Sequence, residues 1–336
     1  MDNQLSDCFE KSLNPVFTLR PSFAFENGIF SPLERLLKMK PAQIEILTHS
    51  NENIRPANFY QNFLNLKHIL IKIKITNYTS LVSETPDTLL SNFNDHLLND
   101  LKFLKRDDYL NKNNFLLDGE KSDVWIHNDA SISPMTAVNT QKGPVIIDSK
   151  ARVSAFSILN GPLYIGSESV LDKVMISNSR AGRQCRLGGE ISDSLIGNYT
   201  NKHHEGFLGH SIVGDWVNLG ALTTTSDLKN NYGEINLEYG NDIFHTNRIK
   251  FGSIIGDFVK TGIGTMLNTG TIIDIGTLLY QGFKPQKYYP RFYWGGETPL
   301  KYQLNRFLGD IEKIMARRNC QPDEFLKSQI QFIYNK

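Results

Sequence analysis

The sequence predicts a mainly β protein, in which a solenoid of short parallel strands follows a small α/β region and precedes helices. A six-residue repeat that begins near residue 124 predicts the solenoid. The segment 68–76, HILIKIKIT, alternates apolar residues with lysine and predicts a half-buried strand before the solenoid. Apolar residues at helical spacing from Leu304 onward predict an amphipathic helix after it.

Two helices are expected in the N-terminal region. The first should begin at Ser31, because proline follows it and a glutamate stands three positions later, at the spacing of a capping box. The second lies within 86–106, where large apolar residues recur at helical spacing after the possible cap Thr85. Residues 1–118 are therefore expected to form a small α/β domain.

The six-residue repeat predicts the shape of the central domain, residues 119–285. An aliphatic residue or threonine recurs every six positions, and a small or β-branched residue follows four positions later. This spacing is typical of coils with flat faces, in which one side chain per face points inward and a small residue fits the corner. Residues 286–336 should then form an extension with two helices, the second near 322–334, that cap the open end of the solenoid. The clearest repeat comprises Ile255, Thr261, Leu267 and Ile273, each followed by Val259, Thr265, Thr271 and Thr277.

The composition argues against nucleic-acid and membrane partners. The formal net charge is +1 over 336 residues, whereas both partners require clustered excess lysine and arginine. No apolar run approaches the roughly 18–20 residues of a membrane helix, and the N-terminus lacks the pattern of a signal peptide. The three cysteines lie far apart, which favours reduced thiols. We therefore expect a cytoplasmic protein.

The segment 201–233 combines three histidines with glycine, asparagine, threonine and aspartate. His203, His204 and His210 fall within eight residues. A neutral imidazole can act as a general base, and imidazoles also bind zinc. Adjacent histidines rarely converge on one ion and no cysteine cluster accompanies them, so no metal site is predicted. An exposed polar loop is the third interpretation.

Four stretches together resemble a known family: GRQCRLGGEISDSLIGNYTNKHHEGFLGHS, VNLGALTTTSDLKNNYGEI, GDFVKTGIGTMLNTGTI and PRFYWGG. They are similar to the left-handed β-helix acyltransferases and, more closely, to the GlmU-like sugar nucleotidyltransferase/acetyltransferase family. The resemblance covers roughly 124–300. It implies a left-handed coil, acetyl-CoA or another acyl-CoA as co-substrate, and a homotrimer with sites between subunits.

The resemblance also implies roles for individual residues. His204 falls on the position of the catalytic histidine, Asn218 on a substrate-contacting asparagine, and Ala221 on an alanine near the acyl donor. Phe207 replaces a tyrosine of the family, which removes a hydroxyl from the substrate side. Other polar residues of the same segment are candidates to bind the substrate's phosphate or carboxylate groups, although a solvated loop face is an alternative. These are Lys202, Asp227, Lys229 and Asn230.

The stretch FTLRPSFAFENGIFSPLER, residues 17–35, is similar to the opening of the GlmU-like subgroup. Arg20, Gly28 and Arg35 match its motif, whereas Glu26 stands where the subgroup has a second arginine. The glycine-rich phosphate loop of ordinary sugar nucleotidyltransferases is absent, so no cluster of backbone N–H groups is expected to hold a triphosphate. We expect a reduced domain without nucleotidyl transfer; Mg²⁺ would be needed only if that activity were retained.

The expected function is an acyl-CoA-dependent transferase, in particular an acetyltransferase, acting on a sugar phosphate or a nucleotide sugar. One alternative is a sugar-1-phosphate nucleotidyltransferase of the UDP-GlcNAc pyrophosphorylase type. Another is a non-catalytic trimeric scaffold, since a fold does not guarantee an activity. If the protein is an acyltransferase, acyl transfer should depend on His204. If it is a scaffold, the removal of His204 should have no effect.

Overall fold

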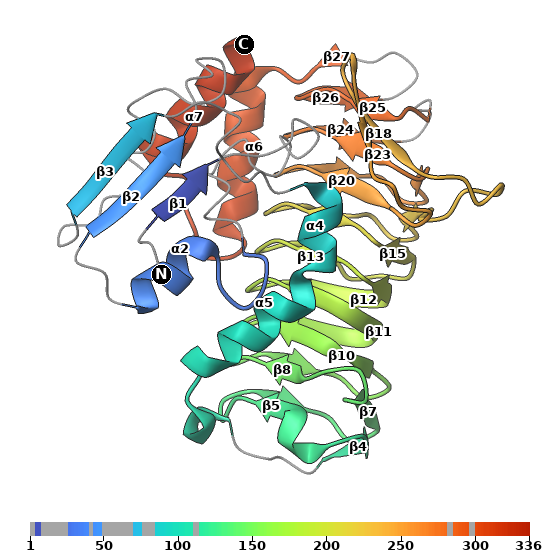
Figure 1. Cartoon of the computed structure of the whole chain (residues 1–336). Coiled ribbons are helices and arrows are strands. Elements are labelled where there is room, and N and C mark those ends of the chain that lie inside the picture. The colour runs from blue at the N-terminus through green and yellow to red at the C-terminus, as the bar shows by residue number, and fades with distance from the viewer. Residues whose placement is uncertain are drawn as a thin grey trace.

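The chain forms a tall parallel β-helix with helices along its sides (Figure 1). Its strands are short and pair in register from one coil to the next, as the six-residue repeat predicts. The predicted fold class is therefore confirmed. The computed structural model describes residues 4–7, 26–39, 43–48, 70–75, 85–109, 114–280, 285–295 and 300–336.

The coils have three faces, which we name A, B and C. Face A contains β5 (Val124–Ile126), β8 (Val145–Ile147), β13 (Leu195–Ile196), β16 (Ile212–Val213), β20 (Ser253–Ile255), β23 (Thr271–Ile273) and β25 (Tyr288–Tyr289). Face B contains β6 (Ser131–Ile132), β9 (Arg152–Val153), β14 (Asn201–Lys202), β21 (Lys260–Thr261), β24 (Leu278–Leu279) and β26 (Tyr293–Gly295). Face C contains β4 (Phe115–Asp118), β7 (Thr136–Asn139), β15 (Phe207–Gly209), β17 (Thr224–Thr225) and β22 (Met266–Leu267). Three longer strands continue from one face to the next: β10 (Ile158–Ile165), β11 (Val170–Ala181) and β12 (Arg186–Ser192).

Columns of aliphatic side chains fill the interior, one column per face. On face A, Ile147 pairs with Ile165, and both are fully buried. Three residues of the sequence repeat, Ile255, Leu267 and Ile273, lie in the same core. The small or β-branched residues that follow each of these positions by four are also buried. The repeat therefore correctly identified the inward positions.

The corners of the coil need residues with a left-handed backbone. Phe258, Gly264, Gly270 and Gly276 recur six positions apart, with φ angles of 60°, 74°, 66° and 67°. Glycine adopts this conformation without steric cost. A side chain at Gly276 would also come within 2.8 Å of the Phe307 ring, so the close approach of that ring requires glycine there.

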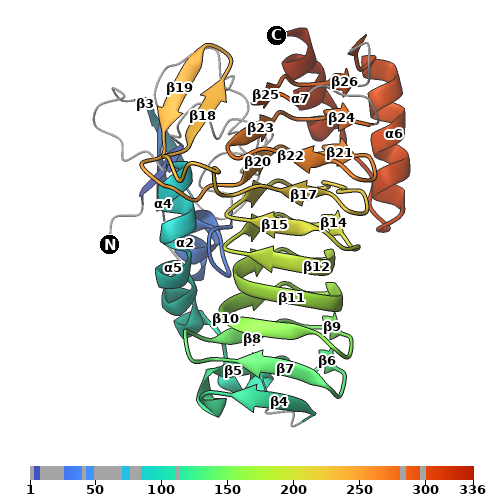
Figure 2. The same cartoon turned by 90° about the vertical axis from the view of Figure 1, so that its right-hand side faces the viewer.

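Figure 2 shows the hand of the coil. On the side facing the viewer, the chain passes from β14 on the right to β15 on the left, and from β21 to β22 in the same direction. It meanwhile climbs from β4 at the bottom to β26 at the top. A coil that crosses its near face from right to left as it rises is left-handed, as the resemblance implies.

The N-terminal elements agree with the predicted caps. α2 (Pro32–Lys38) begins after Ser31, and both hydrogen bonds of the capping box to Glu34 are present. α4 (Pro86–Ser91) begins after Thr85, and α5 (Phe93–Asp100) follows it, ending in a 3₁₀ turn at Leu101–Phe103. The predicted strand over 68–76 is β3 (Leu70–Ile75), which pairs in parallel with β2 (Gln43–Thr48); β2 also pairs with β1 (Gln4–Asp7).

Helices α4 and α5 lie against the outside of face A (Figures 1 and 2). Leu89, Phe93 and Leu97 are at most 1% exposed and pack on outward-facing residues of that face, such as Ile146 and Ile212. Burial of this apolar surface holds the two helices to the solenoid. Other residues of the same cluster include Tyr164, Leu195, Ile235, Phe251, Ile254 and Ile272.

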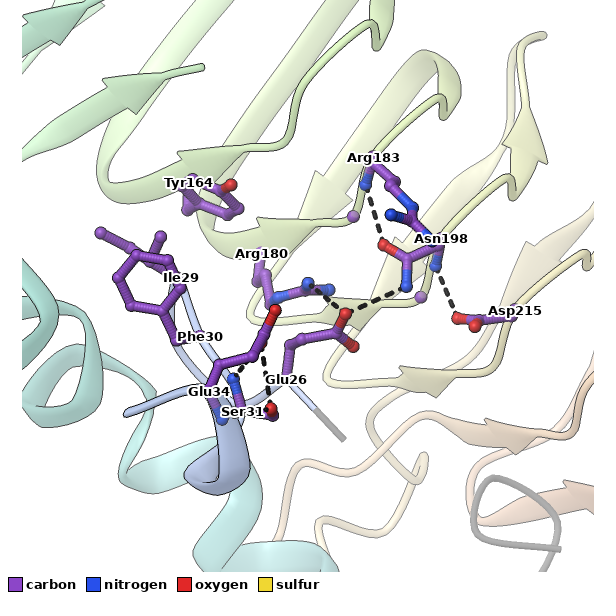
Figure 3. Close-up of polar contacts among 12 residues, drawn as sticks. Glu26, Ile29, Phe30, Ser31, Glu34, Tyr164, Arg180, Arg183, Asn198 and Asp215 are labelled. Carbon is purple, nitrogen blue, oxygen red and sulfur yellow. Dashed lines mark hydrogen bonds and ion pairs between the residues drawn. The ribbon is translucent and has the colours of Figure 1, made fainter. Parts of the chain in front are cut away.

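A buried arginine joins residues 26–39 to the solenoid (Figure 3). Arg180 donates from Nε to the Gly28 carbonyl (3.0 Å), and its Nη2 lies 3.7 Å from the Glu26 carboxylate. Asn198 donates to the same carboxylate (3.1 Å). Glu26, which replaces the second arginine of the subgroup, therefore pairs with an arginine of the solenoid.

The two predicted C-terminal helices are present as α6 (Leu304–Ala316) and α7 (Glu324–Asn335). α6 runs along the corner between faces A and B at the C-terminal coils (Figure 2). The Phe307 ring lies 6.3 Å from the Phe258 ring and 5.1 Å from the Phe292 ring, measured between centroids. The helices thus cover a row of aromatic corner residues along the flank of the last coils.

Two antiparallel pairs complete the described structure. β18 (Asn236–Tyr239) and β19 (Asp242–His245) form a hairpin beside face A, and β27 (Leu300–Lys301) pairs with β26. β4 belongs to face C through its pairing with β7, and the division of the chain into domains at residue 118 stays a prediction. Among the described residues, no helix is long and apolar enough to cross a membrane.

Candidate active site

The histidine pair lies at the corner between faces B and C. His203 and His204 follow β14 and precede β15. The His204 side chain is exposed and makes no hydrogen bond to any described residue. The His203 ring packs edge-on against the His204 ring at 5.2 Å, and its Nε2 lies 3.8 Å from the Asp172 carboxylate. Of the two, His204 is the imidazole that is free to meet a substrate.

The loop that carries His204 is held from inside the coil by Lys202. This lysine is 2% exposed, and its Nζ donates to the carbonyls of Gly188 (2.8 Å) and His204 (3.0 Å). It pairs with Leu187 in the interior column of face B. Burial lowers the pKa of the amine to about 8, although nearby Glu205 acts in the opposite direction.

Ala221 lies on the next coil, at the same corner. The Leu222 amide donates to the Glu205 carbonyl (2.8 Å), which fixes the two coils against each other beside His204. The Ala221 amide donates no hydrogen bond within the described part of the chain, whereas its carbonyl accepts one from Gly264. The structure therefore brings the predicted base and a free backbone N–H to neighbouring coils.

Asn218 lies on face B, near the C-terminal end of α6. It forms a β-bridge with Asn201 and accepts a hydrogen bond from the Asn201 amide (2.9 Å). Together with Arg317 and Arg318 it lines a small pocket of about 90 Å³. The sequence analysis did not identify these two arginines as site residues. Their position as a basic pair at the end of a predicted helix could have indicated them.

Three other predicted residues lie at the opposite end of the face C strands. Asp227 follows β17, and its carboxylate lies 2.7 Å from Nδ1 of His210, which follows β15. Lys229 donates from Nζ to the Glu234 carbonyl, and Asn230 is exposed. Within one chain these residues do not meet His204, because a whole strand separates the two corners.

The separation of the histidines also bears on the zinc hypothesis. His210 stands one strand away from His203 and His204, so the three rings do not converge. Across the part of the chain that the structure describes, no group of three or more His, Cys, Asp or Glu side chains could hold a metal ion.

The N-terminal motif residues make contacts within the protein. Arg35 pairs with the buried carboxylate of Asp100 through Nε (2.6 Å) and Nη2 (2.8 Å), and donates from Nη1 to Asn27. A side chain at Gly28 would lie 2.5 Å from that carboxylate, so glycine is needed for the close approach. Arg20 lies outside the described residues.

The chain is similar in sequence to proteins named GlmU. The chain is 29% identical over 275 residues to the bifunctional protein GlmU of Methanococcus aeolicus, which covers 81% of this chain and 58% of that protein. It is 35% identical over 91 residues to GlmU of a Picosynechococcus species, which covers 26% of this chain and 16% of that protein. A bifunctional sugar-1-phosphate nucleotidylyltransferase/acetyltransferase of Sulfurisphaera tokodaii is 26% identical over 149 residues, covering 42% and 36%.

The chain spans less than two thirds of the length of each of these relatives. No family model matches it. A Bacillus cereus protein of known structure, with a provisional acetyltransferase assignment, aligns at 14% identity over 62% of this chain and 100% of its own. The TM-score of that alignment is 0.23, which is too low to add to the comparison.

Proposed function

We propose that this chain, which is similar to GlmU proteins and folds as a parallel β-helix, transfers an acyl group from acyl-CoA to a sugar phosphate or a nucleotide sugar. The observation that carries the proposal is the corner at His204. There an exposed imidazole without a hydrogen-bond partner among the described residues lies beside a coil with a free amide at Ala221.

In this reaction His204 acts as the general base. It takes a proton from the attacking amine or hydroxyl as the new bond to the thioester carbon forms. The Ala221 N–H donates to the oxygen that becomes negatively charged. The carbon–sulfur bond then breaks, and the CoA thiolate receives the proton that His204 holds.

Arginines beside this corner support a polyphosphate donor such as acyl-CoA. Arg152 and Arg186 occupy the outer side of face B, and Arg318 approaches them from the end of α6. Partial burial lowers the pKa of Arg186, and the positive charges of Arg318 and Arg152 act in the same direction. Nε of Arg318 is buried and has no hydrogen-bond partner among the described residues. Like charges held together in this way favour a bound anion, and the phosphates of CoA would supply one.

We further propose that three copies pack side by side through face C. The outward residues Leu116, Ile158 and Met175 lie in register on this face and are 69%, 41% and 43% exposed. In Figure 2 the face is turned to the viewer, while α4, α5 and α6 lie at its two sides. An apolar column of this kind is typical of a surface covered by another chain. Packing of this kind would bring His204 of one copy towards residues of another.

Two glutamates on face C are expected to separate the copies. The variant with Ile158→Glu and Met175→Glu would bury two carboxylates in the contact, which is unfavourable without partners. Light scattering after size exclusion should show three chains for the native protein and one for the variant. Ser131→Glu, an exposed change on face B, should leave the mass unchanged. A monomeric native protein, or a variant that stays trimeric, would refute this arrangement.

Binding of the acyl donor tests the proposed reaction directly. Acetyl-CoA at 100 times its dissociation constant should raise the free energy of unfolding by about 2.7 kcal/mol, which thermal unfolding can detect. Release of the CoA thiol should then require a hexosamine phosphate or a nucleotide sugar. Stabilisation by a nucleoside triphosphate with Mg²⁺ but not by acetyl-CoA would instead favour nucleotidyl transfer. No response to either ligand would favour the scaffold.

A further inference from the structure

Two large apolar side chains stand exposed at the corner between faces B and C. Met135 lies between β6 and β7, and Phe156 lies one coil higher, between β9 and β10. Their φ angles are 62° and 64°, a left-handed backbone that is unfavourable for a residue with a side chain. The two side chains are nevertheless 65% and 67% exposed. The solenoid therefore holds two apolar side chains outward at positions where glycine would be less strained.

The corner between faces A and B shows what such residues can do. Trp216, Phe258 and Phe292 occupy its left-handed positions, with φ angles of 60°, 60° and 56°. They are at most 9% exposed and belong to one apolar cluster with Phe307 of α6. In this protein a row of apolar corner residues is thus the surface on which a helix packs. No helix of the described chain covers the exposed pair in the same way.

Helix α5 presents an exposed leucine beside face C. Leu98 is 48% exposed and lies four positions after Asn94, so both residues lie on one side of the helix. Asn94 lines a cavity with Asn160 and Ser177 at the corner between faces C and A. Leu98 therefore lies on the side of α5 that borders face C. Because α5 contacts β10 and β11, it stands at the level of Phe156, which precedes β10.

Packing through face C would bring these two sides together. Copies related by an axis parallel to the solenoid keep each residue at the same level, and one side of face C then meets the other side of that face in the next copy. In Figure 2 the corner between faces B and C lies to the right of the face and α5 lies to the left, both at the level of β10. The exposed Phe156 of one copy thus comes opposite the exposed Leu98 of the next.

Opposite charges fall in register with this contact. Lys173 occupies the same corner one coil above Phe156, and Asp95 precedes Leu98 by three residues on α5. Strands of adjacent coils lie about 4.8 Å apart, and three residues of a helix rise about 4.5 Å. Because the chain descends from α4 to α5 in Figure 2, Asp95 lies on the upper side of Leu98, at the level of Lys173. Both charged side chains are exposed, and neither makes a hydrogen bond or an ion pair with a described residue.

We propose that α5 of one copy packs on the corner between faces B and C of the next copy, with Leu98 on Phe156 and Asp95 beside Lys173. The inference rests on the packing through face C proposed above and adds the N-terminal region to that interface. The apolar pair supplies most of the stabilisation, because an exposed ion pair contributes little and mainly orients the contact. The N-terminal helices then cover a neighbouring solenoid as well as their own.

Cross-linking of the full chain tests the contact. In the variant with Leu98→Cys and Phe156→Cys, a short bis-maleimide should join neighbouring chains into linked dimers and trimers on a denaturing gel. The matched control combines Leu98→Cys with Leu222→Cys, because Leu222 is exposed further up the same corner. Each single variant controls for the native cysteines. The control pair and the single variants should stay unlinked.

An aspartate at the corner tests the same contact without a cross-linker. Phe156→Asp should raise the dissociation constant of the trimer at least tenfold in sedimentation velocity, because it places a carboxylate against Leu98. Leu300→Asp, a similarly exposed change near the other end of the solenoid, should have no effect. Thermal unfolding of each variant checks that it is folded.

The outcomes separate this contact from the packing on which it rests. A monomeric native protein would overturn both. A native trimer in which the cysteine pair stays unlinked, or in which Phe156→Asp associates as tightly as the native chain, would overturn the contact with α5 alone. Neither measurement needs an acyl donor, so both are independent of the proposed reaction.

Discussion

Replacing His204 by alanine is expected to slow acyl transfer at least about 100-fold, the lower end of what a positioned general base contributes. The imidazole is exposed and makes no hydrogen bond to a described residue, so its removal should leave the solenoid intact. The rate of CoA thiol release, measured with saturating acyl-CoA and acceptor, reports the change. A lower maximal rate with unchanged binding of acetyl-CoA is the signature of a lost base.

His203→Ala is the matched control for this experiment. The two histidines are adjacent and in ring contact, but the Nε2 of His203 faces Asp172. We expect the His203 variant to retain most of the activity. Equal losses in both variants would indicate a damaged loop rather than a lost base. Full activity in His204→Ala would exclude His204 as the general base.

The solenoid was predictable because its repeat is local. Every coil needs an apolar side chain at the same inward position, as at Ile255 and Ile273, so the six-residue spacing alone identifies these residues. The helix caps at Ser31 and Thr85 were predictable for the same reason, since a cap depends on three or four neighbouring residues.

The candidate site was only partly predictable, because several contacts join distant parts of the chain. The Glu26–Asn198 hydrogen bond spans 172 positions, and no local pattern signals it. Asp227 comes near His210 rather than His204, because the direction of the strands decides which corner each residue reaches. The family resemblance gave each residue an expected role, whereas the fold determines which of these side chains lie close together.

Lys202 is a charged residue at a buried position of the coil. Its position in the repeat is an inward one, between Leu187 below and Leu219 above, where an aliphatic side chain is expected. The sequence analysis instead took its charge as a sign of substrate binding. The amine is buried and bonded to two carbonyls, one of them that of His204, so its most direct effect is on the loop that carries the candidate base.

Replacing Lys202 by methionine is expected to change how stability depends on pH. Burial lowers the pKa of this amine to about 8, against about 10.4 for an unfolded lysine. Between these values the unfolded chain binds more protons than the folded one, so the free energy of unfolding of the native protein rises with pH. At about 1.36 kcal/mol per pKa unit, the rise due to Lys202 is about 3 kcal/mol, and Lys202→Met should lack it.

Urea unfolding of both proteins at pH 7 and pH 10.5 measures this difference, because titrations of other groups cancel between them. The methionine leaves the Gly188 and His204 carbonyls without the lysine donor, which costs about 1–3 kcal/mol for each buried group at either pH. The free energy of unfolding of the variant minus that of the native protein should therefore fall by about 3 kcal/mol as the pH rises from 7 to 10.5. Lys150→Met, an exposed change, should give a curve parallel to the native one. If Lys202→Met also gave a parallel curve, the pKa of the amine would be the same in the folded and unfolded states, as for a solvated lysine. The buried contact to the His204 carbonyl could then not be what holds the loop.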